Sequence, residues 1–129
     1  MNNKTKGSNA ERELLFMLYE QGYAISRVAG SGSSTLPTPD IIAIKKNKGF
    51  AIECKTKSGE YLNIRPSQID ELEIWERLSG LKSIVAWRLG KNKWYFIHYT
   101  KMKKTKKAYS IKRKEIQENG LDFKELLKH

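Results

Sequence analysis

Two short apolar segments separated by a four-residue turn most constrain how this chain can fold. The first is Asp40–Lys45 (Asp-Ile-Ile-Ala-Ile-Lys) and the second is Phe50–Lys55 (Phe-Ala-Ile-Glu-Cys-Lys). The intervening Lys-Asn-Lys-Gly contains residues that tolerate positive φ angles, so the pattern predicts a β-hairpin. Because apolar residues fall on both faces of both strands, we expect the hairpin to lie centrally in a sheet covered on both sides.

Charged residues interrupt this apolar hairpin. Side chains alternate along a strand, so Glu53 and Lys55 should project to one side, and Ile52 and Cys54 to the other. Asp40 begins the first strand, and the hairpin brings its carboxylate towards the same face. A surface ion pair between Lys55 and one acid is the simplest interpretation. The apolar surroundings favour a second one, because buried charges persist where they bind a metal or take part in chemistry.

Two acids and a lysine in one place suit metal-assisted hydrolysis of a phosphodiester. Mg²⁺ prefers oxygen ligands, so the carboxylates of Asp40 and Glu53 and the backbone carbonyl of Cys54 could hold it, with Mn²⁺ as a substitute. Lys55 would orient the attacking water and favour its deprotonated form through its positive charge. The Cys54 side chain faces the predicted core, so we expect it to pack and not to react.

The rest of the chain predicts helices around a sheet. We expect a helix from about Ala10, capped by Ser8 or Asn9 and ended by Gly22, and a loop over residues 29–39. Further helices are predicted at Pro66–Ser79, ended by Gly80, and at Asp122–Leu127; further strands are predicted at Tyr23–Val28, Ser83–Leu89 and Trp94–Tyr99. This order favours one α/β domain over residues 1–129, with a mixed sheet of about five strands flanked by helices.

The charge of the chain favours a polyanionic partner. The 129 residues carry a formal net charge of +11, and Tyr99–Lys114 holds eight Lys or Arg and no acid. This segment could be a solvated loop or a phosphate-binding arm, and we favour the arm. Residues 1–8 form a second basic arm in this interpretation. The residues expected to contact DNA from these and nearby segments are Lys4, Lys6, Ser33, Lys57, Lys101, Lys103, Lys104, Lys106 and Lys107.

Composition also excludes several classes of protein. A single cysteine permits neither an internal disulfide nor a cysteine-based zinc site. No apolar run has the length of a membrane span, and the N-terminus lacks the apolar stretch of a signal peptide. We therefore expect an intracellular, cytoplasmic protein with no membrane contact and no small-molecule cofactor.

The N-terminal helix adds one more acid of interest. Glu11 shares a helix face with Leu14, Leu15 and Leu18, whereas Glu13 falls on the far side. An acid on a leucine face is unusual, although interaction with the helix dipole, worth about 0.3–1 kcal/mol, would also explain it.

In combination these residues resemble the archaeal Holliday-junction resolvases of the restriction-endonuclease-like nuclease superfamily. Pro39-Asp40 and Glu53-Cys54-Lys55 match the Pro-Asp…Asp/Glu-x-Lys signature, which falls here on the predicted hairpin. Gly7-Ser8-Asn9-Ala10-Glu11-Arg12 matches the opening of the N-terminal helix, and Ala29–Ser33 matches a serine-containing loop. The likeness covers nearly all of the first hundred residues, and Lys101–Lys114 has no clear counterpart motif.

The resemblance implies a restriction-endonuclease-like fold and a structure-selective, Mg²⁺-dependent endonuclease that resolves four-way DNA junctions in recombination and repair. It makes Asp40 and Glu53 metal ligands, Lys55 the catalytic lysine and Glu11 a catalytic acid at the metal. Ser31 becomes a loop residue required for cleavage in some members. Arg12 and Arg27 match positions expected to meet the DNA backbone.

Paired cleavage of a junction suggests a homodimer with two-fold symmetry. In the helix Pro66–Ser79, Ile69, Leu72 and Leu78 cover one side, while Ile74 and Trp75 lie outside that stripe. The helix could be buried within its own monomer, but the resemblance places an aromatic at Trp75 in the dimer core. We therefore expect Ile74, Trp75 and Leu78 at a dimer interface.

Two other functions remain open at this point. A restriction-like or repair nuclease acting on linear duplex DNA would use the same motif. A catalytically silent DNA-binding or architectural protein would share the fold, but it would have no reason to keep Glu11, Asp40, Glu53 and Lys55 together.

Overall fold

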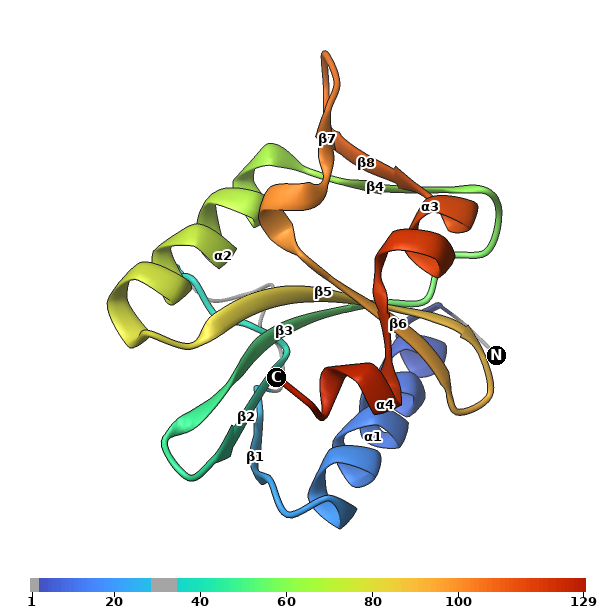
Figure 1. The fold of residues 1–129 in the computed structure, drawn as a ribbon. Helices are drawn as coiled ribbons and strands as arrows, with labels where there is room; N and C mark the ends of the chain where they lie inside the picture. Colours follow the sequence, from blue (N-terminus) through green and yellow to red (C-terminus); the bar gives the residue numbers. More distant parts are fainter. Residues whose placement is uncertain (1–2, 29–34) are drawn as a thin grey trace.

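A mixed six-stranded sheet forms the centre of the computed structural model, which describes residues 3–28 and 35–129 (Figure 1). The strand order is β1-β2-β3-β5-β6-β9, in which β3 and β5 are parallel and the other neighbours are antiparallel. The strands are β1 (Ala24–Arg27), β2 (Ile41–Lys45), β3 (Lys48–Lys55), β5 (Lys82–Gly90), β6 (Lys93–His98) and β9 (Leu121–Asp122).

Within the described residues, a small antiparallel sheet and four α-helices surround the main sheet. The small sheet has the order β4-β8-β7, and residues 99–101 form a short 3-10 helix before it. The bounds are β4 (Tyr61–Ile64), β7 (Lys103–Lys104), β8 (Tyr109–Lys112), α1 (Asn3–Glu20), α2 (Pro66–Ser79), α3 (Arg113–Asn119) and α4 (Phe123–Leu126). The described helices include none that is long and apolar enough to cross a membrane.

The main sheet separates two hydrophobic cores. On one face α1 and α4 cover the sheet, and Leu14, Leu18 and Ile52 lie in that core (Figure 1). On the other face α2, α3 and the small sheet surround a second core that contains Leu72 and Trp87. The predicted mixed sheet flanked by helices is confirmed, and β3 is covered on both faces because it lies between the two cores.

The predicted hairpin is present, but its turn is shorter than expected. Ile41 of β2 pairs with Ile52 of β3, and the turn between the strands is only Lys46-Asn47, both with positive φ. Gly49 does not need a positive φ; a Cβ there would collide with the backbone carbonyl of Ala43. β2 is also less covered than expected, because Ile44 is 38% exposed.

The first helix differs most from the prediction. It begins at Asn3 rather than near Ala10, so residues 3–8 extend α1 and do not form a separate arm. Glu13, expected on the uncovered side, is half-buried and accepts hydrogen bonds from Arg88 (2.9 and 3.1 Å) and from Nε1 of Trp94 (2.7 Å). These bonds tie α1 to the β5–β6 hairpin.

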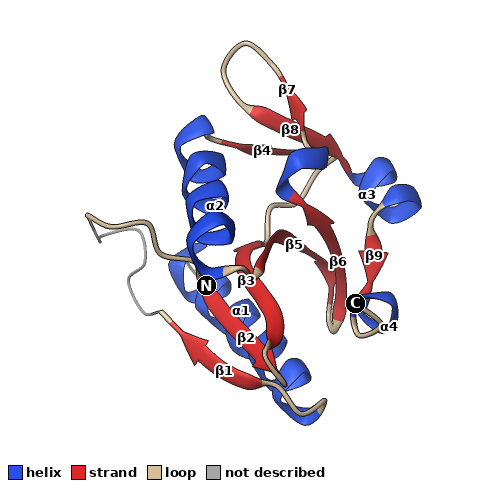
Figure 2. Ribbon diagram, turned by 60° about the vertical axis from the view of Figure 1, so that its left-hand side comes forward, coloured by secondary structure: helices blue, strands red, loops and turns tan. Residues whose placement is uncertain are grey.

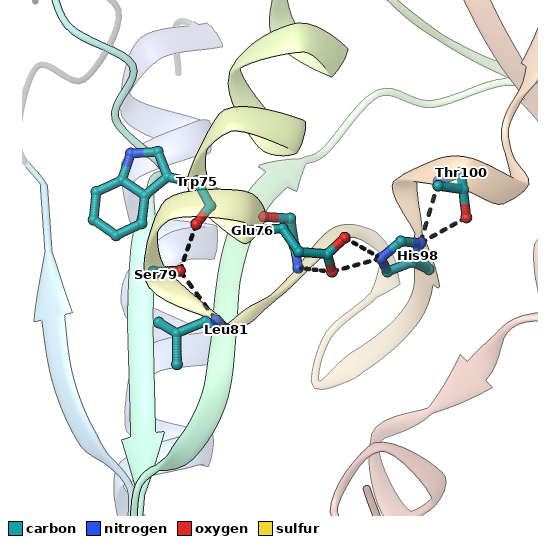
Figure 3. A network of polar contacts seen from close by, with 7 residues as sticks. Trp75, Glu76, Ser79, Leu81, His98 and Thr100 are labelled. Atoms are coloured by element: carbon teal, nitrogen blue, oxygen red, sulfur yellow. Dashed lines mark hydrogen bonds and ion pairs between the residues drawn. The ribbon is translucent and has the colours of Figure 1, made fainter.

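The second helix has the predicted bounds, and its C-terminal half is held by polar contacts. Pro66 starts α2, and Gly80 ends it in the left-handed conformation. Oε1 of Glu76 accepts a hydrogen bond from the backbone N–H of Ser83 (3.2 Å) and lies 2.7 Å from Nε2 of His98 (Figure 3). Nε1 of Trp75 donates to the carbonyl of Pro37 (2.6 Å). The helix is therefore attached to β5, β6 and the segment before β2.

Sequence patterns did not predict the small sheet, α3 or the last strand of the main sheet. β4, β7, β8, α3 and β9 were not predicted, and the basic segment 101–114 was expected to be a loop or an arm. It contains β7, β8 and the start of α3. Each of these strands has only two to four residues, too few to produce a recognisable alternation.

Candidate active site

Asp40 lies at the junction of β1, β2 and β3, just before β2 begins. Its backbone N–H donates to the carbonyl of Ile52 (3.0 Å), and its carbonyl accepts from the N–H of Val28 (3.0 Å). Its side-chain Oδ2 accepts a hydrogen bond from the backbone N–H of Cys54 (2.8 Å). With only 8% of its surface exposed, Asp40 is held from three directions in a single orientation.

Glu53 and Lys55 lie side by side on the α2 face of β3, as the strand alternation predicted. Nζ of Lys55 is 3.3 Å from Oε2 of Glu53, and their side chains are 23% and 15% exposed. Ile52 and Cys54 face the opposite core. The sequence-based assignment of these two faces is confirmed.

Gln68, in the first turn of α2, completes this cluster and was not predicted. Its amide oxygen accepts a hydrogen bond from Nζ of Lys55 (3.2 Å), and its amide nitrogen donates to Oε2 of Glu53 (3.3 Å). No local pattern distinguishes Gln68 from any polar residue in a first helical turn. The only signal in the sequence was its place, one residue before the buried Ile69, on the edge of the face that α2 turns to the sheet.

Glu11 approaches Asp40 from the α1 side of the sheet. Its Oε1 accepts a hydrogen bond from Nε of Arg27 (3.2 Å), which belongs to β1. Arg27 was expected to meet the DNA backbone, and the structure pairs it with this acid at 23% side-chain exposure. The negative charge of Asp40 acts on both Glu11 and Glu53.

Burial and the charge of Asp40 raise the pKa values of Glu53 and Glu11. Burial and then the negative charge of Asp40 raise the pKa of Glu53 to about 7, although Lys55 opposes the shift. Burial and Asp40 likewise raise the pKa of Glu11, against the opposing effect of Arg27. The cluster therefore holds more negative charge than its own cations balance, and a bound cation would relieve this repulsion.

Cys54 behaves as a packing residue. It packs against the core beneath α1, and burial raises the pKa of its thiol well above the usual value; Asp40, Glu11 and Glu53 add to the shift. A thiol of this kind stays protonated and is a poor nucleophile. Its contribution to the site is the backbone N–H that orients Asp40.

The donor atoms fit a hard divalent cation only in part. Within residues 3–28 and 35–129, no three His, Cys, Asp or Glu side chains are placed to hold a metal ion together. Mg²⁺, however, is commonly bound by one or two carboxylates, with waters and substrate phosphates as the remaining ligands. Asp40 and Glu53 fit that pattern, because their oxygens lie close enough for their charges to repel.

The residues predicted to bind DNA are spread over several elements. Ser31 and Ser33 lie outside the described residues, and of Lys4 only the backbone, in α1, is described. Lys6, Arg12 and Lys57 are exposed. Exposed lysines also gather on the β7–β8 hairpin and the turn before it, which project away from the main sheet (Figure 2): Lys101, Lys103, Lys104, Lys106 and Lys107.

The predicted dimer residues form an apolar surface beside the segment that precedes Asp40. Ile74, Trp75 and Leu78 line a hollow of about 370 Å³ together with Leu36 and Pro37. Leu78 is 75% exposed, so its predicted position on the covered side of α2 with Ile69 and Leu72 was wrong. The correction enlarges the exposed apolar surface of this helix.

Comparison with known proteins gives one consistent result. A family model described as archaeal Holliday junction resolvase (Hjc) matches residues 2–129. The crossover junction endodeoxyribonuclease Hjc of Archaeoglobus fulgidus is 34% identical over 123 residues, which are 95% of this chain and 90% of that protein. The corresponding Hjc of Sulfolobus acidocaldarius is 30% identical and is covered over 91% of its length by the whole of this chain.

The fold agrees with a solved structure of the same kind. The structure of Archaeoglobus fulgidus Hjc, described as a Holliday junction resolvase from an archaeal hyperthermophile, superposes with a TM-score of 0.85 at 31% identity. The match covers 94% of this chain and 99% of that one.

Proposed function

The chain belongs to the archaeal Holliday junction resolvase (Hjc) family, and we infer that Asp40, Glu53 and Lys55, with Glu11 beside them, form its phosphodiesterase site. As a member of this family the chain is a crossover junction endodeoxyribonuclease. The observation that carries the assignment of the site is the buried meeting of two carboxylates and a lysine at the β2–β3 junction, with the pKa of Glu53 raised to about 7.

Asp40 and Glu53 would hold Mg²⁺, or Mn²⁺ in its place, with the backbone carbonyl of Cys54 and the acid Glu11 as further ligands. A divalent cation supplies Lewis-acid stabilisation of charge on the scissile phosphate and on the departing oxygen. The unbalanced negative charge around Asp40 supports this assignment.

Lys55 would act on the attacking water and on the phosphate. Its ammonium is held 3.3 Å from Glu53, and it has three N–H donors for its two contacts with Glu53 and Gln68. A further N–H remains to orient water or a phosphate oxygen, and the positive charge offsets the negative charge that develops there. Ser31, which lies outside the described residues, would assist cleavage.

The substrate is four-way junction DNA bound mainly through its phosphates. Exposed lysines of the β7–β8 hairpin supply positive charge without a base-reading motif, which suits recognition of shape. Lys6 and Arg12 on α1 lie on the same helix as Glu11 and would contact phosphates near the scissile bond. Arg27 would also contact a DNA phosphate while it remains paired with Glu11.

We also infer a homodimer formed through α2. A junction has two strands to cut at symmetry-related places, and a two-fold dimer presents two sites to it. The exposed Leu78, with Ile74 and Trp75, supplies an apolar surface at which such a partner could pack.

A cleavage assay on a synthetic four-way junction, run beside a linear duplex of the same sequence, tests the proposal. Asp40→Ala and Glu53→Ala should abolish cleavage and still bind the junction, whereas Glu20→Ala, a change of an exposed acid at the end of α1, should cut normally. Full cleavage by either site variant would overturn the assignment of the site. Equal cutting of linear duplex would overturn the junction as the preferred substrate.

A further inference from the structure

Gln68 links Glu53 and Lys55 of β3 through a single amide group. Lys55 donates to its oxygen at 3.2 Å, its nitrogen donates to Glu53 at 3.3 Å, and Lys55 is also 3.3 Å from Glu53. The three side chains close a triangle in which every contact joins a donor to an acceptor. We propose that Gln68 is a positioning residue that holds Lys55 and Glu53 in the geometry needed for cleavage.

An amide side chain satisfies both neighbours at once. An ammonium can only donate hydrogen bonds, and an ionised carboxylate can only accept them. Gln offers one acceptor to Lys55 and one donor to Glu53, and it adds no charge to a site that already holds uncompensated carboxylates. A Glu or a Lys at position 68 would repel one of the two partners.

The hydrogen bonds of Gln68 also limit how strongly the opposite charges of Lys55 and Glu53 neutralise each other. Without Gln68 the lysine would have Glu53 as its nearest partner, and the ion pair could draw in both carboxylate oxygens. Among the described residues, both contacts of Glu53 use Oε2. Gln68 thereby favours an arrangement in which the other oxygen, Oε1, can bind the cation while Lys55 stays beside it.

The contacts that hold α2 against the sheet fix the position of Gln68 relative to β3. The buried Ile69 and Leu72 hold the N-terminal half of the helix against the sheet. Glu76 holds the other half, through Ser83 and His98 (Figure 3). A side chain in the first turn of a helix held at both ends can therefore position groups on β3.

Gln68→Met is the sharpest test, because methionine has a similar length but no amide, whereas alanine would leave room for a water that could restore the contacts. Gln117→Met, the same change at an exposed position of α3, is the matched control. We expect the junction-cleavage kcat of Gln68→Met to fall at least about tenfold, as outer-sphere substitutions commonly do. Junction affinity measured without divalent cations should stay within about twofold of wild type.

Gln68→Glu separates a positioning role from a packing role. It keeps the size of the side chain and still accepts from Lys55, but it cannot donate to Glu53 when ionised. We expect its kcat to fall as far as that of Gln68→Met and its Mn²⁺ affinity, measured by calorimetry without DNA, to change by at least about tenfold. Wild-type kcat in either variant would overturn the proposal.

Folding and the underlying site are controlled separately. Thermal unfolding checks each variant, and Gln68→Asn, which keeps the amide but is one methylene too short to bridge, replaces Gln68→Met if that protein does not fold. The inference rests on the proposed function, so Glu53→Ala is assayed in parallel. Loss of cleavage in Glu53→Ala with full cleavage in the Gln68 variants defeats the role of Gln68 alone, whereas full cleavage by Glu53→Ala defeats the proposed site itself.

Discussion

The backbone N–H of Cys54 donates a hydrogen bond of 2.8 Å to Oδ2 of Asp40, which couples the orientation of the carboxylate to the pairing of β2 with β3. The residue between Glu53 and Lys55 therefore contributes through its backbone while its side chain packs in the core. This hydrogen bond separates two requirements at Asp40, an acceptor for the fold and a negative charge for the chemistry.

Asp40→Asn should separate these requirements. The amide oxygen can still accept from Cys54, so we expect the free energy of unfolding to stay within about 1 kcal/mol of wild type, whereas Asp40→Ala should lose about 1–3 kcal/mol. Both variants should lose at least about a hundredfold in junction cleavage, because the charge that binds the cation is gone. Urea denaturation and single-turnover cleavage measure the two effects, and an active Asp40→Asn protein would contradict the proposed role of the charge.

Glu13→Ala should destabilise the protein without a direct effect on chemistry. Burial alone would raise the pKa of Glu13, but hydrogen bonds from Arg88 and Trp94 lower it below its usual value. Removing the carboxylate leaves the half-buried Arg88 without its partner, and we expect a loss of about 2–3 kcal/mol in urea denaturation. Glu20→Ala on the exposed end of α1 is the control. Equal stability of the two variants would show that the hydrogen bonds of Glu13 do not hold the helix.

The raised pKa of Glu53 predicts a pH dependence of stability. Its pKa rises from 4.5 to about 7 on folding, so between these values the folded state retains a proton that the unfolded state has released. Without divalent cations, the free energy of unfolding should therefore fall as pH rises from about 5 to about 7.

Glu53→Gln should make that decline shallower, and the part due to Glu11, whose pKa is also raised, should remain. Urea denaturation at three pH values, with and without Mg²⁺, measures both effects. Mg²⁺ should stabilise the wild-type protein most at the high end of the range, where the carboxylates are ionised. If the free energies of unfolding of wild type and Glu53→Gln fell in parallel with pH, the raised pKa of Glu53 would be contradicted.

Replacing Lys103, Lys104, Lys106 and Lys107 by Ala should weaken junction binding in a salt-dependent way. For each DNA phosphate that the variant no longer neutralises, the slope of log K against log salt should become shallower by about 0.9. Binding titrations at several salt concentrations measure the slope. A variant with Lys124 and Lys128 replaced serves as the control, and an unchanged slope in the hairpin variant would show that the hairpin does not bind DNA.

Leu78→Glu should dissociate the proposed dimer and leave the monomer folded. Leu78 is 75% exposed, so the change costs the monomer little, whereas a charge in an apolar interface is unfavourable. Sedimentation equilibrium should give a mass near twice 14.9 kDa for wild type and near 14.9 kDa for the variant. A wild-type protein that sediments as a monomer at micromolar concentration would contradict the dimer.

Local patterns in the sequence determined the hairpin, the faces of its residues and the bounds of α2. Alternation along a strand depends only on backbone geometry, so Glu53 and Lys55 had to share a face whatever surrounded them. Pro66 has a fixed φ that suits the start of a helix, and Gly80 readily adopts the positive φ that ends one, so these two residues mark the ends of α2 from within the chain.

The tertiary structure alone decided which distant groups meet these residues. Gln68 reaches β3, Arg27 pairs with Glu11 and Arg88 pairs with Glu13 because helices and strands far apart in the chain pack together. The exposure of Leu78 likewise depends on which side of α2 the sheet covers. Local sequence specifies the conformation of a segment, whereas the partners of its side chains depend on how the whole chain buries its apolar surface.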